Sequence, residues 1–582
     1  MKNSSTNYVA VQWACRFPRF GKWLFLFALW GVASVALAQD RTISGAVTST
    51  DGGAALPGVN VIVKGTTTGT VTDIDGNYRL NVPESAEVLQ FSFIGYQALE
   101  VVIGGQSTID VSMDEDVQQL TEVVVTAMGI EREQRELGYA VSTVNGEELT
   151  RVRSDNALNA LSGRVPGVRV TSQSGTAGGS VQVQIRGANS LAGTSQPLYV
   201  VDGVPISNNA FNGSRNDIIG GGADVGNRAG DLNPDDIENI SILKGASAVA
   251  LYGQRARDGV VMITTKRGKK GQASIQVNSS LRFDRPFRLP DFQNEYAQGD
   301  FGVFDSNNFT GGWGPRISEV QGQNFPQFPF NGEDRPLQAY PDNVRDFYET
   351  GTTLINSVSF GTANDMLDFR LGYTNLNQKG IVPGNELNRS SFSINTGAQL
   401  TDKVKARASV NYVRTEGIGR PRQGSNDPNI VVSQVNGLPR TLDVDRLRNN
   451  VVDENGDAIG VNGNNTANNP FWVVNNNPLN NRVERIYGNI QLEYDPTDWL
   501  NIMGRIGTDF FDETRRSIIR KGTINRLNGE FDDRTIFQRQ INSDVIATVT
   551  KDISSKIGFR GLVGWNVNQI INERTRVRAS DL

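Results

Sequence analysis

The second half of the chain repeats one pattern that restricts the folds it can adopt. From residue 272 onward, runs of about ten residues alternate apolar and polar side chains, as in SFSINTGAQ at residues 391–399. A period of two predicts β-strands with two unlike faces. We place nine strands, at residues 272–283, 353–361, 366–376, 390–400, 403–414, 483–494, 499–511, 536–549 and 554–568.

The connections between these strands alternate in length. Short turns at residues 362–365, 401–402, 495–498 and 550–553 alternate with medium or long connections at residues 284–352, 377–389, 415–482 and 512–535. Short turns at one end and long loops at the other are typical of outer-membrane barrels, whose strands of about ten residues span the apolar band. Residues 272–582 are therefore predicted to form an antiparallel transmembrane β-barrel. Its short turns would face the periplasm, and the Asn-rich stretch at residues 464–478 would be extracellular.

The N-terminus has the composition of an export signal. Residues 1–38 hold four basic and no acidic residues and end in the apolar run WLFLFALWGVASVALA. A basic segment, an apolar core of about a dozen residues and a small-residue end predict a cleaved signal peptide. Cleavage is expected between Ala38 and Gln39. The alternative, a membrane anchor, is disfavoured because a spanning helix needs roughly 20 apolar residues.

The histidine and cysteine content limits the catalytic and metal-binding chemistry of this chain. The chain has no histidine, and Cys15, inside the predicted signal, is its one cysteine. Serine–histidine and cysteine–histidine nucleophile systems and histidine-containing metal sites are thereby excluded, and the expected mature chain forms no disulfide. The 57 basic and 62 acidic residues give −5, and removing the four basic residues of the signal leaves 53 against 62, or −9. This charge argues against a nucleic-acid partner, and we expect no cofactor.

Residues 39–113 read as a small β-domain. Short alternating runs, TISGAVTS, GVNVIVKG, TVTD, NYRLNV, VLQFSFIGY and STIDVSM, are separated by Gly, Pro, Asp and Asn turns, which predicts a β-sandwich. Asp73, Asp75 and Gly76 invite a calcium-loop reading. However, Gly76 is at the fourth position, where an EF-hand loop has its glycine at the sixth. A tight hairpin turn is the expected structure.

A small α/β unit is expected at residues 138–271, between these β regions. The run PLYVVDGVPI at residues 197–206 predicts a strand closed by a turn, and GVVMITTKRG at residues 259–268 predicts another. Asn233 can cap a helical turn that begins at Pro234, and Ser154 or Asp155 can cap a helix through Leu161. The run GTAGG lacks the GxxxxGK[ST] pattern of a phosphate-binding loop and a clear helix after it, so a mobile loop is expected.

This α/β unit resembles the plug of TonB-dependent outer-membrane transporters of the SusC/RagA-like family. The resemblance rests on GRVPGVRV (163–170), VQIRGANSL (183–191), PLYVVDGVPI, LNPDDIENISILKGASAVALYG (232–253) and GVVMITTKRG, in that order. It implies that residues 39–113 are a carboxypeptidase-regulatory-like domain. The resemblance further implies a SusD-like surface lipoprotein as partner, an outer-membrane location, and energy supplied through TonB.

In this family a short segment between the N-terminal domain and the plug, the TonB box, binds TonB. Here the linker at residues 114–137 holds the β-branched run TEVVVTA, which we take as the box: Thr121, Glu122, Val123, Val124, Val125, Thr126 and Ala127. An extended segment can add as a strand to the sheet edge of a partner. The alternative is that Val123, Val124 and Val125 form merely the last strand of one domain or the first of the next.

The predicted barrel is short for this family. Such barrels resemble closed sheets of about 22 strands around a plugged lumen, and an open sheet would leave backbone groups unpaired in lipid. The chain end, ERTRVRASDL, also lacks the usual terminal aromatic residue. From the resemblance we therefore expect this chain to be the N-terminal portion of a protein of roughly a thousand residues. Measuring the mass of the native product would test this expectation.

The expected function is TonB-dependent uptake of a bulky nutrient across the outer membrane, with an oligosaccharide favoured over a peptide. Trp313, Phe471 and Trp472, in the long loops, could stack on sugar rings, although each could instead anchor its own loop. One alternative is a receptor or adhesin that does not transport. Another is a surface polysaccharide enzyme, which would need paired carboxylates in a cleft, and no spacing in the sequence supports this enzyme reading.

Overall fold

The computed structural model describes residues 41–581 with gaps. The gaps are residues 51–52, 67, 84–85, 94, 115–122, 126–130, 134–140, 152–153, 189–194, 211–219, 246–247, 250–251, 272, 309–310, 327–333, 425–428, 463–465 and 555–556. The chain forms two compact units, Met1–Thr121 and Glu122–Leu582, and each is described by itself. Within the described residues, no helix combines the length and apolarity that crossing a bilayer requires.

The first unit is a β-sandwich, as the sequence predicts. One sheet has the order β4-β1-β7 and the other β3-β2-β5-β6. The strands are β1 (Arg41–Ser49), β2 (Asn60–Val63), β3 (Gly69–Val71), β4 (Asn77–Val82), β5 (Val88–Ser92), β6 (Leu99–Val102) and β7 (Val111–Met113). The inward residues of both sheets, Ile43, Val61 and Phe91 among them, are fully buried and form one core. Alternation of buried and exposed residues along β4 shows why the period of two predicted these strands.

Two details of this unit differ from the sequence prediction. Strand β6 was not predicted, because its residues are largely exposed and lack a buried alternating face. The turn at Asp73 is not a hairpin, since β3 and β4 belong to different sheets. Asp73 Oδ1 instead accepts the backbone N–H groups of Asp75 (3.0 Å) and Asn77 (2.8 Å), which closes the corner between the sheets.

The second unit begins with a short hairpin and continues into the plug domain. The hairpin pairs β8 (Val123–Val125) with β9 (Glu131–Glu133). The plug sheet has the order β10-β16-β17-β13-β14, and β11 and β12 form a separate pair. Its elements are β10 (Val141–Asn145), α2 (Gly146–Arg151), η3 (Ala157–Leu161), β11 (Val168–Ser172), β12 (Val181–Ile185), β13 (Leu198–Val201), β14 (Val204–Ile206), β15 (Gly220–Ala223), η4 (Arg228–Asp231), η5 (Pro234–Asp236), β16 (Ile237–Leu243), η6 (Gly253–Ala256) and β17 (Val260–Thr265).

The helical signals in the plug are partly confirmed. Asn233 caps η5 through its side chain, with Pro234 at the first position, as predicted. The helix predicted to end at Leu161 is a short 3-10 helix, and its cap is Asn156, whose side chain accepts from Leu158 N–H, rather than Ser154 or Asp155. Its backbone bonds span three residues, as from Ser162 N–H to Asn159 C=O, which is the 3-10 spacing.

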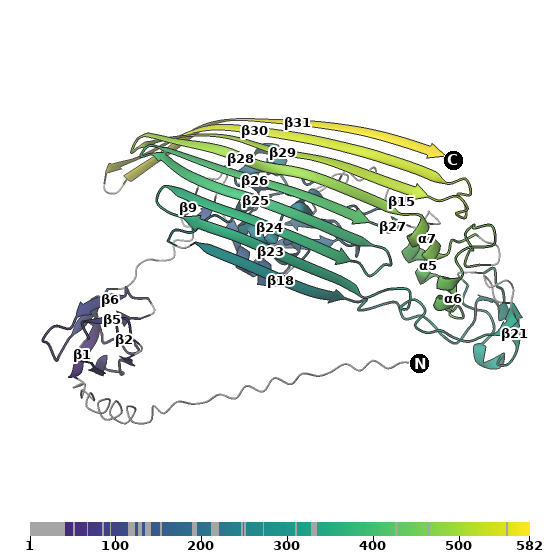
Figure 1. Cartoon of the computed structure of the whole chain (residues 1–582), viewed down its shortest axis with the longest axis horizontal. Coiled ribbons are helices and arrows are strands. Elements are labelled where there is room, and N and C mark those ends of the chain that lie inside the picture. Colours follow the sequence, from purple (N-terminus) through teal and green to yellow (C-terminus); the bar gives the residue numbers. More distant parts are fainter. Residues whose placement is uncertain are drawn as a thin grey trace, which may run out of the picture. The chain divides into compact units, whose positions relative to one another are not determined.

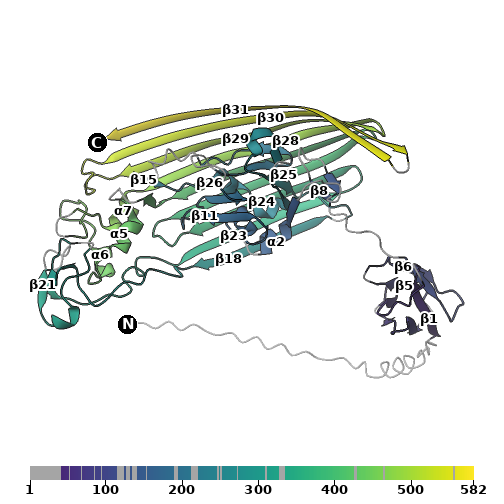
Figure 2. The same ribbon diagram turned by 180° about the vertical axis from the view of Figure 1, so that it is seen from behind.

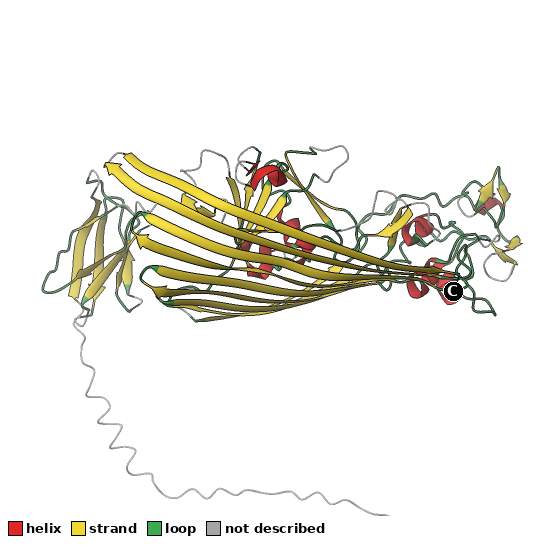
Figure 3. Ribbon diagram, turned by 90° about the horizontal axis from the view of Figure 1, so that it is seen from above, coloured by secondary structure: helices red, strands yellow, loops and turns green. Residues whose placement is uncertain are grey.

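Nine antiparallel strands form one large sheet, which we call the wall (Figure 1). Its order is β18-β23-β24-β25-β26-β28-β29-β30-β31, a meander in which successive long strands pair. The strands are β18 (Ser274–Asp284), β23 (Gly351–Ala363), β24 (Leu367–Lys379), β25 (Glu386–Thr401), β26 (Val404–Ile418), β28 (Leu479–Thr497), β29 (Leu500–Ile519), β30 (Glu530–Ser554) and β31 (Ile557–Ser580). The wall is curved, and the plug lies on its concave face (Figures 2 and 3).

The two faces of the wall reverse the polarity of a soluble protein. Along β25, the concave-face residues Ser391, Ser393 and Asn395 are buried, whereas Phe392 on the convex face is 40% exposed. The convex face also exposes Ile490 of β28. A polar buried face and an apolar exposed face are expected when one side meets lipid and the other encloses a polar interior. The wall is thus a partial β-barrel.

The strand number and turn pattern are confirmed, but the strands are longer than predicted. Strand β30 has 25 residues and β31 has 24, reaching Ser580, where the sequence pattern ended at 549 and 568. The connection predicted at 377–389 is reduced to residues 380–385, because β24 and β25 are also longer than predicted. Beyond the apolar band, both faces carry polar residues, so the alternation fades while the hydrogen-bond ladder continues.

The long connections lie at one end of the wall, the long-loop end, and contain their own small elements. These are β19 (Gly299–Asp300), β20 (Val303–Phe304), η7 (Ile317–Glu319), β21 (Asn324–Pro326), β22 (Asp334–Pro336), β27 (Arg422–Gly424), α5 (Val431–Asn436), α6 (Val444–Asn449) and α7 (Pro470–Asn476). A hydrophobic cluster that includes Phe347, Leu447 and Trp472 joins these loops into one layer. Residues 470–476, expected as part of a plain loop, form α7, with Asn469 as its cap.

Candidate functional site

The interface between plug and wall is the candidate functional site. A segment of the plug, residues 202–210, lies along wall strands β28, β29 and β30, and wall side chains hold its backbone. Asp202 C=O accepts from Arg505 Nη1 (3.3 Å), Pro205 C=O from Gln540 Nε2 (3.0 Å), Ser207 C=O from Arg485 Nη2 (3.1 Å) and Ala210 C=O from Arg515 Nη2, while Ser207 N–H donates to Asp509 Oδ2 (2.7 Å). These bonds satisfy backbone groups of β14, the last strand of the plug sheet, and of the residues that flank it.

Arg485 is the centre of this contact. Its guanidinium, fully buried, donates to both oxygens of Asp509 on the neighbouring strand (2.8 and 2.9 Å). The same group reaches Asp231 of the plug at 3.2 Å and the carbonyl of Arg228 at 2.5 Å. A buried charge needs such complete pairing, because isolated burial would cost several kcal/mol per ion. Arg485 therefore ties plug and wall at a point far from water.

Close backbone packing accompanies these bonds. Gly507 of β29 faces Val204 of β14, and a Cβ at Gly507 would lie 2.5 Å from a methyl group of Val204. Beside it, Arg505 forms a buried ion pair with Asp544 at 2.9 Å. The wall needs glycine at position 507 because any larger residue would push β14 away.

A second contact lies at the tip of the plug. The Asp224 carboxylate accepts from Ser174 Oγ (2.6 Å), Ser180 N–H (2.7 Å) and Gly226 N–H (3.0 Å), which folds the GTAGG loop against residues 224–226. Arg420, just beyond β26, donates to the carbonyls of Ala177 (3.0 Å) and Asp224 (3.2 Å). Burial lowers the pKa of Arg420 to about 10 despite the nearby Asp224. Strand β15 of the plug also pairs with β27 of the long loop.

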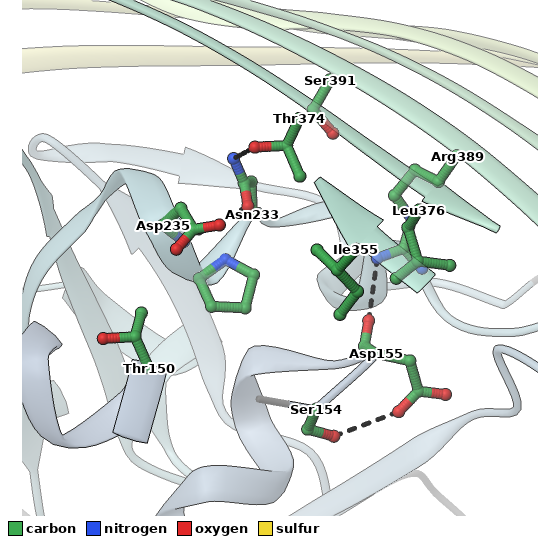
Figure 4. A pocket seen from close by; sticks show the side chains of 11 residues that line it. Thr150, Ser154, Asp155, Asn233, Asp235, Ile355, Thr374, Leu376, Arg389 and Ser391 are labelled. Atoms are coloured by element: carbon green, nitrogen blue, oxygen red, sulfur yellow. Dashed lines mark hydrogen bonds between the residues drawn. The ribbon is translucent and has the colours of Figure 1, made fainter. Parts of the chain in front are cut away.

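The third contact involves η5. Asp236 accepts from Arg370 of β24 at 2.6 Å, and both side chains are almost fully buried. Asn233 donates to Asp236 Oδ2 (2.8 Å) and to Thr374 Oγ1 (3.0 Å), so the residue that caps η5 also holds it to the wall (Figure 4). The predicted capping motif is therefore also part of the docking surface.

The structure describes only the centre of the predicted TonB box. Val123, Val124 and Val125 form β8, paired antiparallel with residues 131–133. Thr121, Glu122, Thr126 and Ala127 lie outside the described residues, as do Ala38 and Gln39 of the predicted cleavage site. An extended backbone at residues 123–125 is compatible with strand addition, although β8 already has one partner strand.

The three loop aromatics occupy two different environments. Phe471 and Trp472 are 3% and 0% exposed, and Trp472 Nε1 donates to Thr523 Oγ1 at 3.0 Å. Neither ring presents a face to a sugar in this structure, so both anchor the loop layer. Trp313 is 64% exposed and packs beside Tyr296 with ring centroids 5.4 Å apart. Of the three, Trp313 is the one open to a ligand.

The polar groups at the interface hold the plug on the wall. Its buried carboxylates, those of Asp224, Asp231, Asp236, Asp509 and Asp544, each accept a hydrogen bond or ion pair from plug or wall. In the part of the chain that the structure describes, no group of three or more His, Cys, Asp or Glu residues is arranged to hold a metal ion.

Sequence reasoning missed the wall arginines. Arg370, Arg485 and Arg505 each occupy a concave-face position of their strand, where alternation expects a polar residue, so they read as ordinary lumen-facing side chains. A signal was present, because a charge inside a membrane segment is costly unless it is paired. The partners could not be read, since Arg485 and Ser207 are 278 positions apart.

Comparison with known proteins identifies the two N-terminal domains. Residues 43–125 match the CarboxypepD_reg-like domain, and residues 133–260 match the TonB-dependent Receptor Plug Domain. TonB-dependent receptor SusC of Bacteroides thetaiotaomicron is 30% identical over 499 residues, which cover 84% of this chain and 45% of SusC. The chain is a homologue of SusC-like TonB-dependent receptors. TonB-dependent receptor P3 of Formosa agariphila is also 30% identical, over 66% of this chain and 34% of P3.

The fold agrees with this homology. The RagAB peptide importer in its open-open state superposes with a TM-score of 0.58 at 21% identity, covering 78% of this chain and 50% of that chain. The predicted architecture is therefore confirmed: an N-terminal carboxypeptidase-regulatory-like domain, a plug and a partial barrel. The chain spans less than half the length of SusC and of P3.

Proposed function

We propose that this chain is part of a TonB-dependent importer that carries a bulky hydrophilic nutrient across the outer membrane. The observation that supports it best is the plug itself, held on the concave face of a membrane-type wall by buried ion pairs such as Arg485 with Asp509. A structure that only binds at the cell surface does not need a closed lumen. A barrel that opens on demand does need a plug with reversible polar contacts.

The energy would enter through the proposed TonB box, residues 121–127. TonB would add to this segment as a neighbouring strand, with backbone hydrogen bonds supplying the affinity. In the described residues β8 pairs with β9 along one edge, so TonB would add along its other edge. The predicted signal, cleaved between Ala38 and Gln39, would deliver the chain to the periplasm, and the N-terminal domain and plug would face that side.

The partner and nutrient follow from the relatives. A SusD-like surface lipoprotein would cover the long-loop end, as the resemblance to the SusC/RagA-like family implies. The resemblance to the SusC/RagA-like family implies an oligosaccharide, whereas RagAB is described as a peptide importer, so both substrate classes enter the test. The exposed Trp313 is the proposed sugar-stacking residue of the long loops.

The test compares surface binding with uptake of labelled glycans and peptides in cells carrying the full-length protein. Val123 and Val125 are replaced by proline and Val124 by glycine, which removes donors and strand propensity from the box. Uptake is expected to collapse while surface binding persists.

The control places proline and glycine at Gln118 and Gln119, in the same linker but outside the box. Uptake by this control should equal that of the parent. Unchanged uptake in the box variant would instead favour the non-transporting receptor.

A further inference from the structure

The convex face of the wall changes from apolar to charged near the long-loop end. On β26, β28 and β29 the apolar positions end at Tyr412, Ile486 and Phe510, which the strand register places side by side. Charged side chains follow on the same face of these strands and of β30. We call this patch the belt, and its members are Arg414, Glu416, Arg482, Glu484, Asp512, Arg516, Asp533 and Arg539.

The opposite edge of the convex face has a different composition. At the short-turn end of the same four strands, the convex positions are apolar or aromatic, namely Val404, Tyr494, Leu500 and Val549. The long loops of such barrels are extracellular and the short turns periplasmic. The belt therefore lies on the side of the outer leaflet.

Most charges of the belt pair with one another at the surface. Arg414 lies 2.6 Å from Glu416, and Arg516 lies 2.7 Å from Asp533. The arginine side chains of these pairs are 46% and 56% exposed. Exposed pairs contribute about 0–1 kcal/mol, so a charged ligand can replace one partner at little cost.

Arg539 is the exception within the belt. In the described part of the chain, its side chain makes no hydrogen bond or ion pair. Apolar side chains surround it on the convex face: Phe510 and Ile571 on the neighbouring strands, and Phe537 and Ile541 on its own strand. A charge on the lipid face is costly unless it reaches the interface or a partner. The position of Arg539 therefore calls for an anion at the rim of the apolar band.

The length of β30 places Arg539 at that rim. About ten residues separate it from Val549, the last apolar convex residue at the short-turn end. At about 3.4 Å per residue and a strand tilt of about 40°, they span roughly 26 Å along the membrane normal. The apolar band of such barrels is about 25 Å tall. The guanidinium of Arg539 thus emerges where the lipid headgroups of the outer leaflet begin.

The chemistry of the belt selects among headgroups. A guanidinium binds phosphate through paired hydrogen bonds, while its aliphatic stem lies along apolar surface. Glu484 and Asp512 face each other on adjacent strands, and two like charges in this position repel. Carboxylates suit a headgroup that brings divalent cations with it, because these cations take oxygen ligands. Phosphorylated glycolipids of the outer leaflet carry both phosphates and bound divalent cations.

We propose that the belt binds a phosphorylated glycolipid of the outer leaflet. Arg539 and Arg414, on either side of the Glu484–Asp512 pair, contact its phosphates. The belt continues the apolar convex face that meets the lipid tails, so one lipid contacts both. This interaction goes beyond transport, because it fixes the height and the surroundings of the wall in the membrane.

The test measures the glycolipid that stays bound to the full-length protein after purification in mild detergent, by lipid extraction and mass spectrometry. Arg539→Gln keeps a polar side chain but removes the charge. Bound glycolipid should fall about tenfold or more, as expected for the loss of a hydrogen bond between charged groups. The matched control is Lys551→Gln, on the same face of β30 at the short-turn end, which should retain the parent's amount. Equal amounts in the two variants would overturn the proposal.

A rebinding experiment identifies the group that is recognised. Delipidated parent protein is mixed with the glycolipid, with the same glycolipid after enzymatic removal of its phosphates, or with phosphatidylglycerol. Only the phosphorylated glycolipid should be retained. Equal retention of the dephosphorylated form would assign binding to the sugars. Equal retention of phosphatidylglycerol would show a general attraction to anionic lipid, and either result would overturn the proposal.

A second variant covers the case in which Arg539→Gln does not reach the outer membrane. Arg414→Gln removes the cation on the other side of the acidic pair and should also lower the bound glycolipid, whereas an unchanged amount would overturn the proposal. Native mass spectrometry of the same samples tests the other occupant of such a face, a second copy of the protein. If the variants lose a second copy and keep the glycolipid, the belt is a contact between proteins and the proposal is wrong.

Discussion

Replacing Arg485 by methionine removes the cation at the centre of the plug–wall contact. Asp509 would keep its bond from the Ser207 amide but lose both bonds from the guanidinium. Asp231 would keep two longer contacts, from Arg228 and from Thr415 Oγ1, each at 3.5 Å. Breaking a buried pair by removing one partner costs about 3–5 kcal/mol, because a charge stays buried without its counterion. Since 1.36 kcal/mol is a factor of ten, docking should weaken roughly 100- to 5,000-fold.

Amide hydrogen exchange in the full-length protein measures this loss directly. The Ser207 N–H is bonded to Asp509 and should exchange faster by about that factor, as should the amides of η4. The control is Arg516→Met on β29, whose pair with Asp533 is partly exposed and is worth about 0–1 kcal/mol. Equal exchange in the two variants would refute the idea that Arg485 docks the plug.

Three further changes probe other parts of the chain. Gly507→Ala should destabilise plug docking by about 1–3 kcal/mol, because the new methyl group would overlap Val204. Limited proteolysis should then cleave the plug faster. The control Gly504→Ala should leave the cleavage rate unchanged, because a Cβ at position 504 meets no atom within 4 Å. Trp472→Ala should loosen the long-loop layer by about 3–5 kcal/mol, the range for truncating a buried aromatic side chain to alanine. Faster tryptic cleavage of these loops should show this, and cleavage at the parent's rate would contradict the anchoring role of Trp472. Burial raises the pKa of Tyr78 to about 12, while its ordinary value is 10.0. The unfolded state therefore loses the proton first, and urea unfolding should show stability falling from about pH 10 toward pH 12. Tyr78→Phe should make this fall smaller, and an unchanged fall would contradict the contribution of Tyr78.

Much of the fold could be read from the sequence because period and loop length are local properties. The nine wall strands and the β-sandwich each show alternation within about ten residues. What failed was local as well: the ends of β30 and β31 carry polar residues on both faces. There Asp532 pairs with Arg534 of its own strand at 3.1 Å and, across to β31, with Arg576 at 2.5 Å. Such ladders are stabilised by cross-strand pairs that hydrophobic patterns do not report.

The docking site could not be read in the same way. Its residues are brought together by the closure of a plug against a wall, over separations such as the 302 positions between Ser207 and Asp509. The sequence placed Asn233 correctly as a helix cap but gave no sign that it also contacts Thr374. Similarly, Phe471 and Trp472 are of the residue types that stack on sugar rings, and only their burial in the structure shows that they belong to a hydrophobic core.

The use of ion pairs at this interface has a physical rationale if the plug must move. An apolar interface would be stabilised by about 25 cal/mol per Å² buried and would pay that amount each time it opened to water. Paired charges regain hydration on separation, so a buried ion pair is often no more stabilising than apolar residues of similar volume. Such an interface specifies one docked arrangement without holding it too firmly.

This reasoning makes a prediction for the double variant Arg485→Met with Asp509→Leu. Removing both charges should restore part of the exchange protection that Arg485→Met loses at the η4 amides, because no carboxylate is left unpaired at position 509. The Ser207 N–H is not a probe here, since Asp509→Leu removes its acceptor. Nutrient uptake should remain below that of the parent, since the new apolar faces resist separation in water. If uptake recovered together with protection, the polarity of the interface would have no role in release, and tight packing alone would account for plug docking.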